Sequence, residues 1–126
     1  MKKIITTEKA PKPVGPYSQA VSAVGFLFIS GQIPINPATG NIAAEGIKEQ
    51  TRQVMENLKA ILNASEMDFT SVVKSTLFIK DMGKFSDVNE VYGSYFSAEP
   101  PARETIEVSR LPKDADIEIS MIAFKA

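Results

Sequence analysis

Residues 116–124 read Asp-Ile-Glu-Ile-Ser-Met-Ile-Ala-Phe and predict a strand that is apolar on both faces. Side chains alternate between the two faces of a β-strand. Alternation places one apolar set on each face, namely Ile117, Ile119 and Met121 against Ile122 and Phe124. Such a strand needs cover on both sides, so it belongs inside a sheet that has a neighbouring layer on each face.

Residues 72–79, Val-Val-Lys-Ser-Thr-Leu-Phe-Ile, predict a second strand of the same kind. They are rich in β-branched residues and too apolar for a half-exposed edge, which favours an interior position. We expect Val73, Leu77 and Ile79 on one face and Val72 and Phe78 on the other.

The rest of the chain supplies more strands and two amphipathic helices. The expected strands are 3–6, 19–24, 26–30 and 103–109, and the expected helices are 47–63 and 81–96. Gly25 marks a hairpin or bulge, and Pro100 and Pro101 are expected to stop the second helix. The order β-β-β-α-β-α-β-β predicts one α+β domain over residues 1–126, with two helices on one face of the sheet.

This arrangement leaves one sheet face without cover. The two helices protect only one side, yet several strands carry apolar residues on both. A large apolar face rarely stays exposed on a soluble monomer. The simplest cover is another copy of the same chain, so we expect a homo-oligomer.

Composition excludes several classes of function. The chain has no cysteine and no histidine, which rules out a cysteine nucleophile, a Ser-His-Asp triad and a Cys/His zinc site. A carboxylate site for a hard cation stays possible, but no spacing suggests a calcium loop, so we expect no metal and no cofactor. The net charge is −1, with scattered lysines and arginines, which argues against nucleic-acid binding. No apolar run is long enough for a signal peptide core or a membrane span, and we expect a cytoplasmic protein without a membrane partner.

Two charged residues lie where charge is unusual. Arg103 follows two prolines and enters a strand in an apolar neighbourhood, so it is either an anion site or a surface charge. Glu118 lies within an apolar run on the same face as Ser120. A carboxylate there must be paired with a cation, protonated or hydrated. This fits either a salt bridge between subunits or a catalytic acid–base.

Other candidates carry weaker signals. Tyr17 follows a Gly-Pro turn and either closes a pocket or packs, and Asn89 is by default a solvated helix residue. Ser30 and Gly31 end a strand, where glycine allows close approach of another group or simply marks a bulge.

At these residues the sequence resembles the reactive intermediate deaminase family, RidA, also called YjgF. The resemblance spans essentially the whole chain, and several motifs occur in the right order. They are residues 15–21 (Gly-Pro-Tyr-Ser-Gln-Ala-Val), 29–34 (Ile-Ser-Gly-Gln-Ile-Pro), 101–103 (Pro-Ala-Arg), 107–114 (Glu-Val-Ser-Arg-Leu-Pro-Lys-Asp) and 117–119 (Ile-Glu-Ile). The resemblance implies a chorismate-mutase-like α+β fold, with two helices on one face of a mixed sheet. It also implies a homotrimer in which the other sheet face lies at the subunit interfaces, with three clefts between subunits.

The resemblance further implies an activity. Family members hydrolyse the enamines and imines 2-aminoacrylate and 2-aminocrotonate, which pyridoxal-phosphate-dependent dehydratases release, to 2-keto acids and ammonia. No cofactor is implied. An imine carbon is already electrophilic, so an anchor, a positioned water and one proton shuttle are enough.

By position, the resemblance assigns roles to seven residues. Arg103 would grip the substrate carboxylate with help from the backbone N–H of Thr105, and Glu118 would handle the attacking water or the leaving ammonia. The residues that would line the pocket are Tyr17, Ser30, Gly31 and Asn89. One departure is Glu104, where the family usually has a small residue, although strand alternation should turn it away from Arg103 and Thr105.

Three rival functions remain. A non-catalytic module that binds 2-keto acids or other small carboxylates would keep Arg103 but would not need Glu118. A ribonuclease is disfavoured by the near-neutral charge and the lack of histidine. A chorismate mutase would need cations for two carboxylates, and only one buried candidate is visible.

Overall fold

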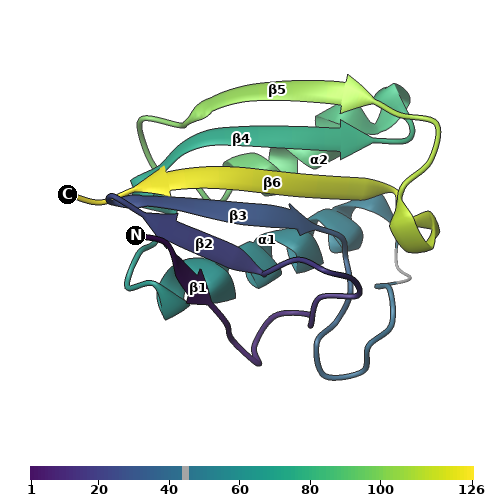
Figure 1. Ribbon diagram of the computed structural model, residues 1–126. Coiled ribbons are helices and arrows are strands. Elements are labelled where there is room, and N and C mark those ends of the chain that lie inside the picture. Colours follow the sequence, from purple (N-terminus) through teal and green to yellow (C-terminus); the bar gives the residue numbers. More distant parts are fainter. Residues whose placement is uncertain (44–45) are drawn as a thin grey trace.

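The computed structural model describes residues 1–43 and 46–126, and over these ranges it has six strands, two α-helices and three short 3₁₀ turns (Figure 1). The strands are β1 (Lys3–Ile5), β2 (Ala20–Ala23), β3 (Phe26–Gln32), β4 (Val72–Ile79), β5 (Ala102–Glu107) and β6 (Ile117–Phe124). The helices are α1 (Ile47–Ala64) and α2 (Phe85–Gly93), and the 3₁₀ turns are Phe69–Ser71, Met82–Lys84 and Pro112–Asp114. The predicted order of strands and helices is confirmed.

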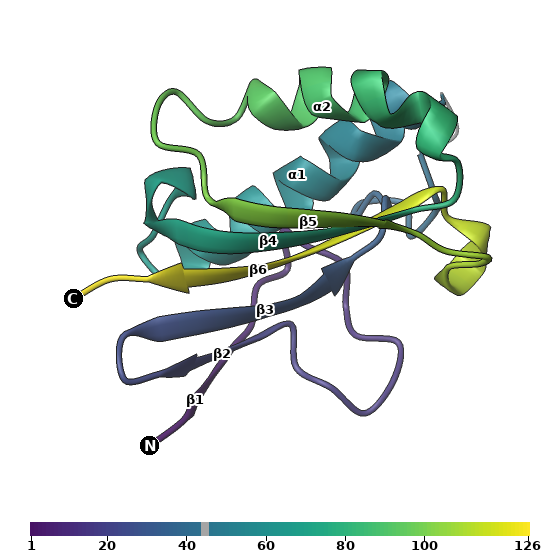
Figure 2. The ribbon, with the colours of Figure 1, turned by 90° about the horizontal axis from the view of Figure 1, so that it is seen from above.

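The strands form one mixed sheet in the order β1-β2-β3-β6-β4-β5. β4 and β5 run parallel, and the other neighbours are antiparallel. Both helices lie on the same side of this sheet, and the other side is open (Figure 2). The α+β arrangement expected from the sequence, two helices on one face of a mixed sheet, is therefore confirmed.

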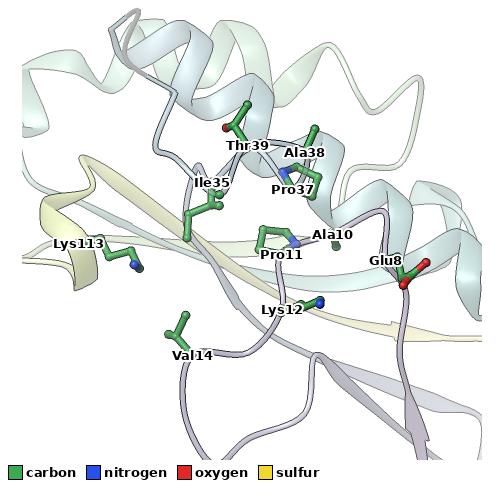
Figure 3. A pocket seen from close by; sticks show the side chains of 11 residues that line it. Glu8, Ala10, Pro11, Lys12, Val14, Ile35, Pro37, Ala38, Thr39 and Lys113 are labelled. Carbon is green, nitrogen blue, oxygen red and sulfur yellow. The ribbon is translucent and has the colours of Figure 1, made fainter.

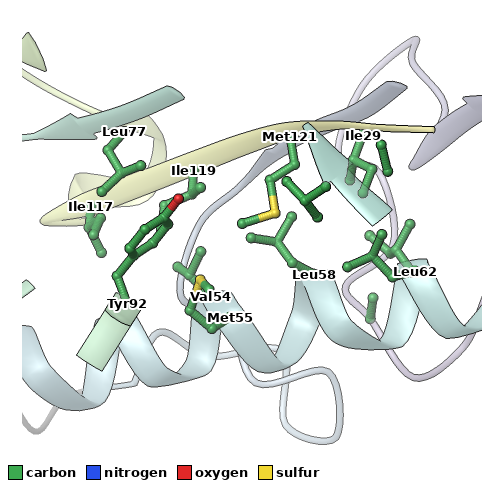
Figure 4. Close-up of a cluster of buried hydrophobic side chains, with 14 of the residues drawn as sticks. Ile29, Val54, Met55, Leu58, Leu62, Leu77, Tyr92, Ile117, Ile119 and Met121 are labelled. Atoms are coloured by element: carbon green, nitrogen blue, oxygen red, sulfur yellow. The ribbon is translucent and has the colours of Figure 1, made fainter. Parts of the chain in front are cut away.

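The main core lies between α1 and the central strands. Val54, Leu58 and Ile61 recur along one side of α1 and are fully buried. Val54 and Leu58 lie beneath the inward side chains of the sheet, among them Leu77 and Ile119 (Figure 4), and Ile61 belongs to the same buried cluster. Burying each such side chain contributes roughly 1.5–3 kcal/mol, so this face of α1 holds the helix on the sheet.

The predicted faces of β4 are wrong for its first two residues. Val72 is 5% exposed and faces the core, whereas Val73 is 46% exposed and lies on the open side. The register against β6 shifts between Val72 and Lys74, as a β-bulge requires. Strict alternation cannot anticipate this extra residue. Leu77 and Ile79 do face the core, as expected.

The second helix is shorter than predicted. The Asp81 carboxylate does cap, accepting a bond from the Gly83 N–H at 2.9 Å, but it caps the 3₁₀ turn that precedes α2. α2 ends at Gly93, well before the two prolines. Beyond it, Phe96 N–H donates to the Gly93 carbonyl at 3.1 Å in a tighter turn, and the Phe96 ring packs on Phe69 at 5.4 Å between ring centroids. This aromatic packing replaces the last predicted helical turn.

The open side of the sheet is apolar, as the sequence predicts. Phe28, Val73, Ile106 and Phe124 project from four neighbouring strands and are each at least 40% exposed. That another copy of the chain covers this face stays a prediction. No helix within the described residues has the length and apolar character needed to cross a membrane.

Candidate functional site

Glu118 lies in a pocket of about 340 Å³ on the open side of the sheet. The pocket is lined by Val14, Tyr17, Ser30, Gly31, Ile33, Pro112 and Glu118. Four of the sequence-predicted site residues thus come together: Tyr17, Ser30, Gly31 and Glu118. We call this group the glutamate half-site.

Gly31 lets the Glu118 carboxylate lie directly against the backbone of β3. A Cβ atom built on Gly31 would be 2.2 Å from Glu118 Oε2 and 2.7 Å from its Cδ, distances that real side chains do not reach. The pairing of β3 with β6 is irregular between Ile29 and Gln32, so the strand opens where the carboxylate crosses it. The absence of a side chain at Gly31 is therefore a steric requirement of this arrangement.

Ser30 and Tyr17 are held by the loop that precedes β2. The Ser30 hydroxyl donates to the Ser18 carbonyl at 2.6 Å, and the Ser30 N–H donates to the Gln19 carbonyl at 3.0 Å. The Tyr17 hydroxyl accepts a bond from the Val14 N–H at 3.2 Å. The Ser30 proton is thus committed to the backbone, whereas the Tyr17 hydroxyl still has its own proton to donate to a ligand.

The environment of Glu118 favours proton transfer. Burial raises the pKa of the Glu118 carboxyl above its ordinary value, because a partly desolvated carboxylate is less stable than its neutral form. Within residues 1–43 and 46–126 no cation or hydrogen-bond donor offsets this burial. A carboxyl with a raised pKa exchanges protons more readily near neutral pH, which suits a general acid–base.

Arg103 lies elsewhere, at the start of the edge strand β5 and under α2. Its Nη1 donates to Asn89 Oδ1 at 2.8 Å, and its guanidinium lies over the rings of Phe85 and Tyr92 at 5.4 and 5.1 Å. The Tyr92 hydroxyl donates to Ser75 Oγ at 2.9 Å. Burial raises the pKa of Tyr92, although the Ser75 hydrogen bond and the Arg103 charge act in the opposite direction. The guanidinium is thus oriented on three sides while most of its five N–H donors remain available to a carboxylate.

Thr105 lies two residues further along β5, on the same face as Arg103. The Val108 N–H, just beyond the end of β5, donates to the Ile79 carbonyl of β4 at 2.9 Å. In a parallel pair every second residue bonds to the neighbouring strand, so the even-numbered residues of β5 direct their N–H groups toward β4. The N–H of Thr105 therefore points to the free edge of the sheet, where a ligand carboxylate can accept it. The Thr105 hydroxyl is buried and has no hydrogen-bond partner among the described residues. We call Arg103, Asn89 and Thr105 the arginine half-site.

The two half-sites lie on opposite faces of the sheet. Arg103 contacts α2 on the helix side, whereas Glu118 is on β6 opposite Phe78 and lies among residues of the open side. A single chain therefore does not bring the two charged groups together. Glu104 also faces the open side and pairs with Lys74 at 2.6 Å, so it turns away from Arg103 as alternation predicts.

Phe85 and Tyr92, the two α2 residues whose rings contact the Arg103 guanidinium, were not among the site residues expected from the sequence. Phe85, Asn89 and Tyr92 stand at spacings of four and three residues, so they form one stripe along α2. That spacing, with an amide between two aromatics, was the available signal that Asn89 is not an ordinary solvated residue. Among the described residues, no group of three or more acidic side chains could hold a metal ion.

The fold and the two half-sites together describe a small α+β protein that presents an arginine and a partly buried glutamate at separate surfaces. The family model described as Endoribonuclease L-PSP matches residues 7–125. The chain belongs to this family, and its resemblance to the reactive intermediate deaminases is confirmed.

Relatives cover almost the whole chain. A RutC family protein of Pyrococcus horikoshii is 58% identical over 99% of this chain and 99% of its own length. Reactive Intermediate Deaminase A, chloroplastic, of Arabidopsis thaliana is 47% identical over 97% of this chain and 65% of its own length. The crystal structure of Escherichia coli TdcF with bound serine is 42% identical, has a TM-score of 0.95 and covers 98% of this chain and 99% of its own.

Proposed function

We propose that this protein hydrolyses small enamine and imine carboxylates, such as 2-aminoacrylate and 2-aminocrotonate, to 2-keto acids and ammonia. The observation that carries the proposal is that both half-sites already hold their charged side chains in an arrangement that suits this reaction. One has an oriented guanidinium beside a free backbone N–H, and the other has a proton-exchanging carboxyl in a largely apolar pocket. A reaction on a small carboxylate needs both.

In the proposed reaction, Arg103 and the Thr105 N–H bind the substrate carboxylate and fix its plane. Glu118 accepts a proton as water adds to the imine carbon, which forms a carbinolamine. Glu118 returns this proton to the nitrogen, and it then takes the proton of the new hydroxyl group and delivers it to the amino nitrogen. The C–N bond breaks, and ammonia leaves as the carbonyl forms. These proton transfers by Glu118 are general acid–base catalysis, which typically increases the rate of a reaction ~10²–10⁴-fold.

The proposal requires that copies of the chain assemble, because one chain keeps the half-sites on opposite faces. We propose a homotrimer in which the open apolar face of each subunit is buried and three clefts form, each with Arg103 from one subunit and Glu118 from its neighbour. Sedimentation equilibrium should give three times the 13.7 kDa chain mass. A stable monomer would contradict both the assembly and the shared cleft.

We test the activity with a pyridoxal-phosphate-dependent threonine dehydratase, the class of enzyme that we propose as the functional partner. Released 2-aminocrotonate is followed as 2-ketobutyrate appears, with semicarbazide competing for the imine. Wild-type protein should raise the rate of keto-acid formation and lower semicarbazone formation, and Arg103→Lys should not. No effect of wild-type protein would refute the proposed activity.

A specific observation also supports the alternative, a non-catalytic module that binds small carboxylates. The related TdcF structure holds serine, which is an amino acid with a free carboxylate. Such a module needs Arg103 but has no use for the proton chemistry of Glu118. Unchanged turnover in Glu118→Gln, with 2-ketobutyrate still bound, would favour this alternative.

We do not propose a ribonuclease activity, although the description of the family model names one. The chain has no histidine for acid–base work, and its net charge of −1 does not favour a phosphate backbone.

A further inference from the structure

A second pocket, of about 410 Å³, lies beside the glutamate half-site and takes no part in the proposed reaction. It is bounded by the segment Glu8–Val14 on one side and by the turn Ile35–Gly40 on the other, with Lys113 reaching in from a third element (Figure 3). Its apolar wall comes from Ala10, Pro11, Val14, Ile35 and Pro37. A cavity of this size accommodates a small organic molecule.

Hydrogen bonds hold the first wall of this pocket in place. The buried Gln19 side chain accepts from the Thr7 N–H at 2.7 Å and donates to the carbonyls of Thr7 and Pro11 at 3.0 and 2.9 Å. One amide thus fixes both ends of a five-residue stretch that contains no helix or strand. Because its shape is built in advance, this wall loses little conformational entropy when a ligand binds.

The second wall is fixed from two directions. Asn57 of α1, itself buried, donates to the Ile35 carbonyl at 2.9 Å. The Asn36 side chain accepts from the Ala38 N–H at 2.8 Å, and the Asn36 carbonyl accepts from the Gly40 N–H at 2.8 Å. The turn is therefore closed on itself and also tied to the helix.

Lys113 is held in a conformation that lysine rarely adopts. Its φ is 57°, in the left-handed region, and the next residue, Asp114, has a φ of 56°. Buried Leu111 and Ala115 anchor the turn on either side, and Arg110 pairs with Asp114 at 3.1 Å. Two successive non-glycine residues in this region are unfavourable, and such outliers gather where function constrains the chain. Here the outlier directs the Lys113 side chain toward the pocket (Figure 3).

The charges of the lining indicate what the pocket can bind. Lys12 and Lys113 contribute two ammonium groups, and Glu8 contributes one carboxylate, which leaves a net charge of plus one. Within the part of the chain that the structure describes, neither lysine has a carboxylate within 4.0 Å. We propose that this pocket is a second binding site, for a monocarboxylate that carries a compact apolar body. A phosphate dianion fits it less well, because of its higher charge and its lack of an apolar part.

The test uses benzoate as a monocarboxylate with an apolar ring and inorganic phosphate as a bare anion. Binding to ¹⁵N-labelled protein is followed by NMR, which separates amides at this pocket (Ala10, Thr39, Gly40, Lys113) from amides at the two half-sites (Gly31, Arg103, Thr105). Benzoate should give saturable shifts at the first group, with at least tenfold tighter binding than phosphate. Absence of saturable shifts there, or equal binding of phosphate, would overturn the proposal.

Two variants at one position separate charge from backbone shape. Lys113→Gly removes the ammonium and fits the left-handed conformation without strain, whereas Lys113→Gln removes the ammonium and keeps the strain. Both should weaken benzoate binding at this pocket at least tenfold, and the matched control Lys3→Gln, on exposed β1, should not. Weakening by glycine alone, or by neither, would refute the role of the Lys113 charge.

Comparison with an arginine variant keeps this proposal distinct from the proposed deaminase. Arg103→Lys should lose turnover and keep benzoate binding at the second pocket, whereas Lys113→Gly should lose that binding. If Arg103→Lys abolishes the shifts at Ala10 and Gly40 as well, benzoate binds only in the reaction cleft and the second site does not exist.

Discussion

Gly31→Ala tests the arrangement of the glutamate half-site through a single methyl group. The new Cβ would lie 2.2 Å from Glu118 Oε2, and ordinary contact begins at 3.4 Å. The carboxylate must therefore move by about 1.2 Å, the difference between these distances, unless the backbone of β3 moves instead. The side chain is the softer of the two, since it turns about its own bonds. Misplacing a catalytic group by 1 Å can cost on the order of 10²-fold in rate, so we expect kcat to fall by about that factor.

The assay is the dehydratase-coupled appearance of 2-ketobutyrate, measured for wild type, Gly31→Ala, Glu118→Gln and the double variant. If Gly31 acts only by giving room to Glu118, the two losses will not add, and the double variant will equal Glu118→Gln. Gly93→Ala is the matched control, because a Cβ there has nothing within 4 Å and its activity should not change.

Two results would contradict this reasoning. Wild-type kcat in Gly31→Ala, with circular dichroism unchanged, would mean that the position of Glu118 over the backbone has no part in turnover. Fully additive losses in the double variant would mean that Gly31 acts on something other than Glu118, such as the path of β3.

The remaining predictions concern single charged residues. Arg103→Ala should lower kcat/KM by roughly 30- to 5,000-fold, since losing one partner of a buried charge pair costs about 2–5 kcal/mol. Arg103→Lys should recover only a small part with circular dichroism and oligomer size unchanged, and activity within about twofold of wild type would refute the anchor. Glu118→Gln should lower kcat by ~10²–10⁴-fold. It should also remove the acidic limb of the pH–rate profile, which in wild type should lie above the ordinary glutamate pKa of about 4.3. If this limb persists in the variant, it belongs to another group. Because burial raises the pKa of Glu118, the folded state holds that proton more tightly than the unfolded chain. The free energy of unfolding of wild type should therefore fall relative to Glu118→Gln as pH rises through this range, and a constant difference in denaturant titrations would argue against the raised pKa. Glu104→Ala should leave KM within twofold, because Glu104 pairs with Lys74 on the other face, and a marked fall in KM would show that Glu104 repels the substrate.

The order of strands and helices could be predicted because the spacing of apolar residues and the positions of turn-forming residues depend only on short stretches of sequence. β4 was predicted over its full length, since its β-branched run is unambiguous. The failures came from tertiary contacts. A bulge exchanged the faces of Val72 and Val73, and aromatic packing on Phe69 ended α2 before its sequence pattern did. Neither effect has a local sequence signature.

The candidate site was predicted in part, for a similar reason. Arg103 and Glu118 drew attention as charges within apolar strands, which is a local anomaly. Their separation onto two faces of the sheet depends on strand register, with Arg103 opposite Ser75 and Glu118 opposite Phe78, and register is not readable from one strand alone. The steric demand at Gly31 arises from a residue 87 positions away in the sequence, and only the pairing of β3 with β6 reveals it.

The open face of the sheet connects stability with the proposed chemistry. Phe28, Ile106 and Phe124 give this face its apolar character, and Glu118 projects from the same side of β6 as Phe124. In the proposed trimer, burial of these side chains drives association, and the same event covers Glu118 and brings a neighbour's Arg103 to it. The energy for assembling the site then comes from hydrophobic burial outside the cleft, so the charged groups need not attract each other strongly enough to hold the subunits together. Glu118 can keep the raised pKa that proton transfer requires, because the substrate carboxylate occupies Arg103.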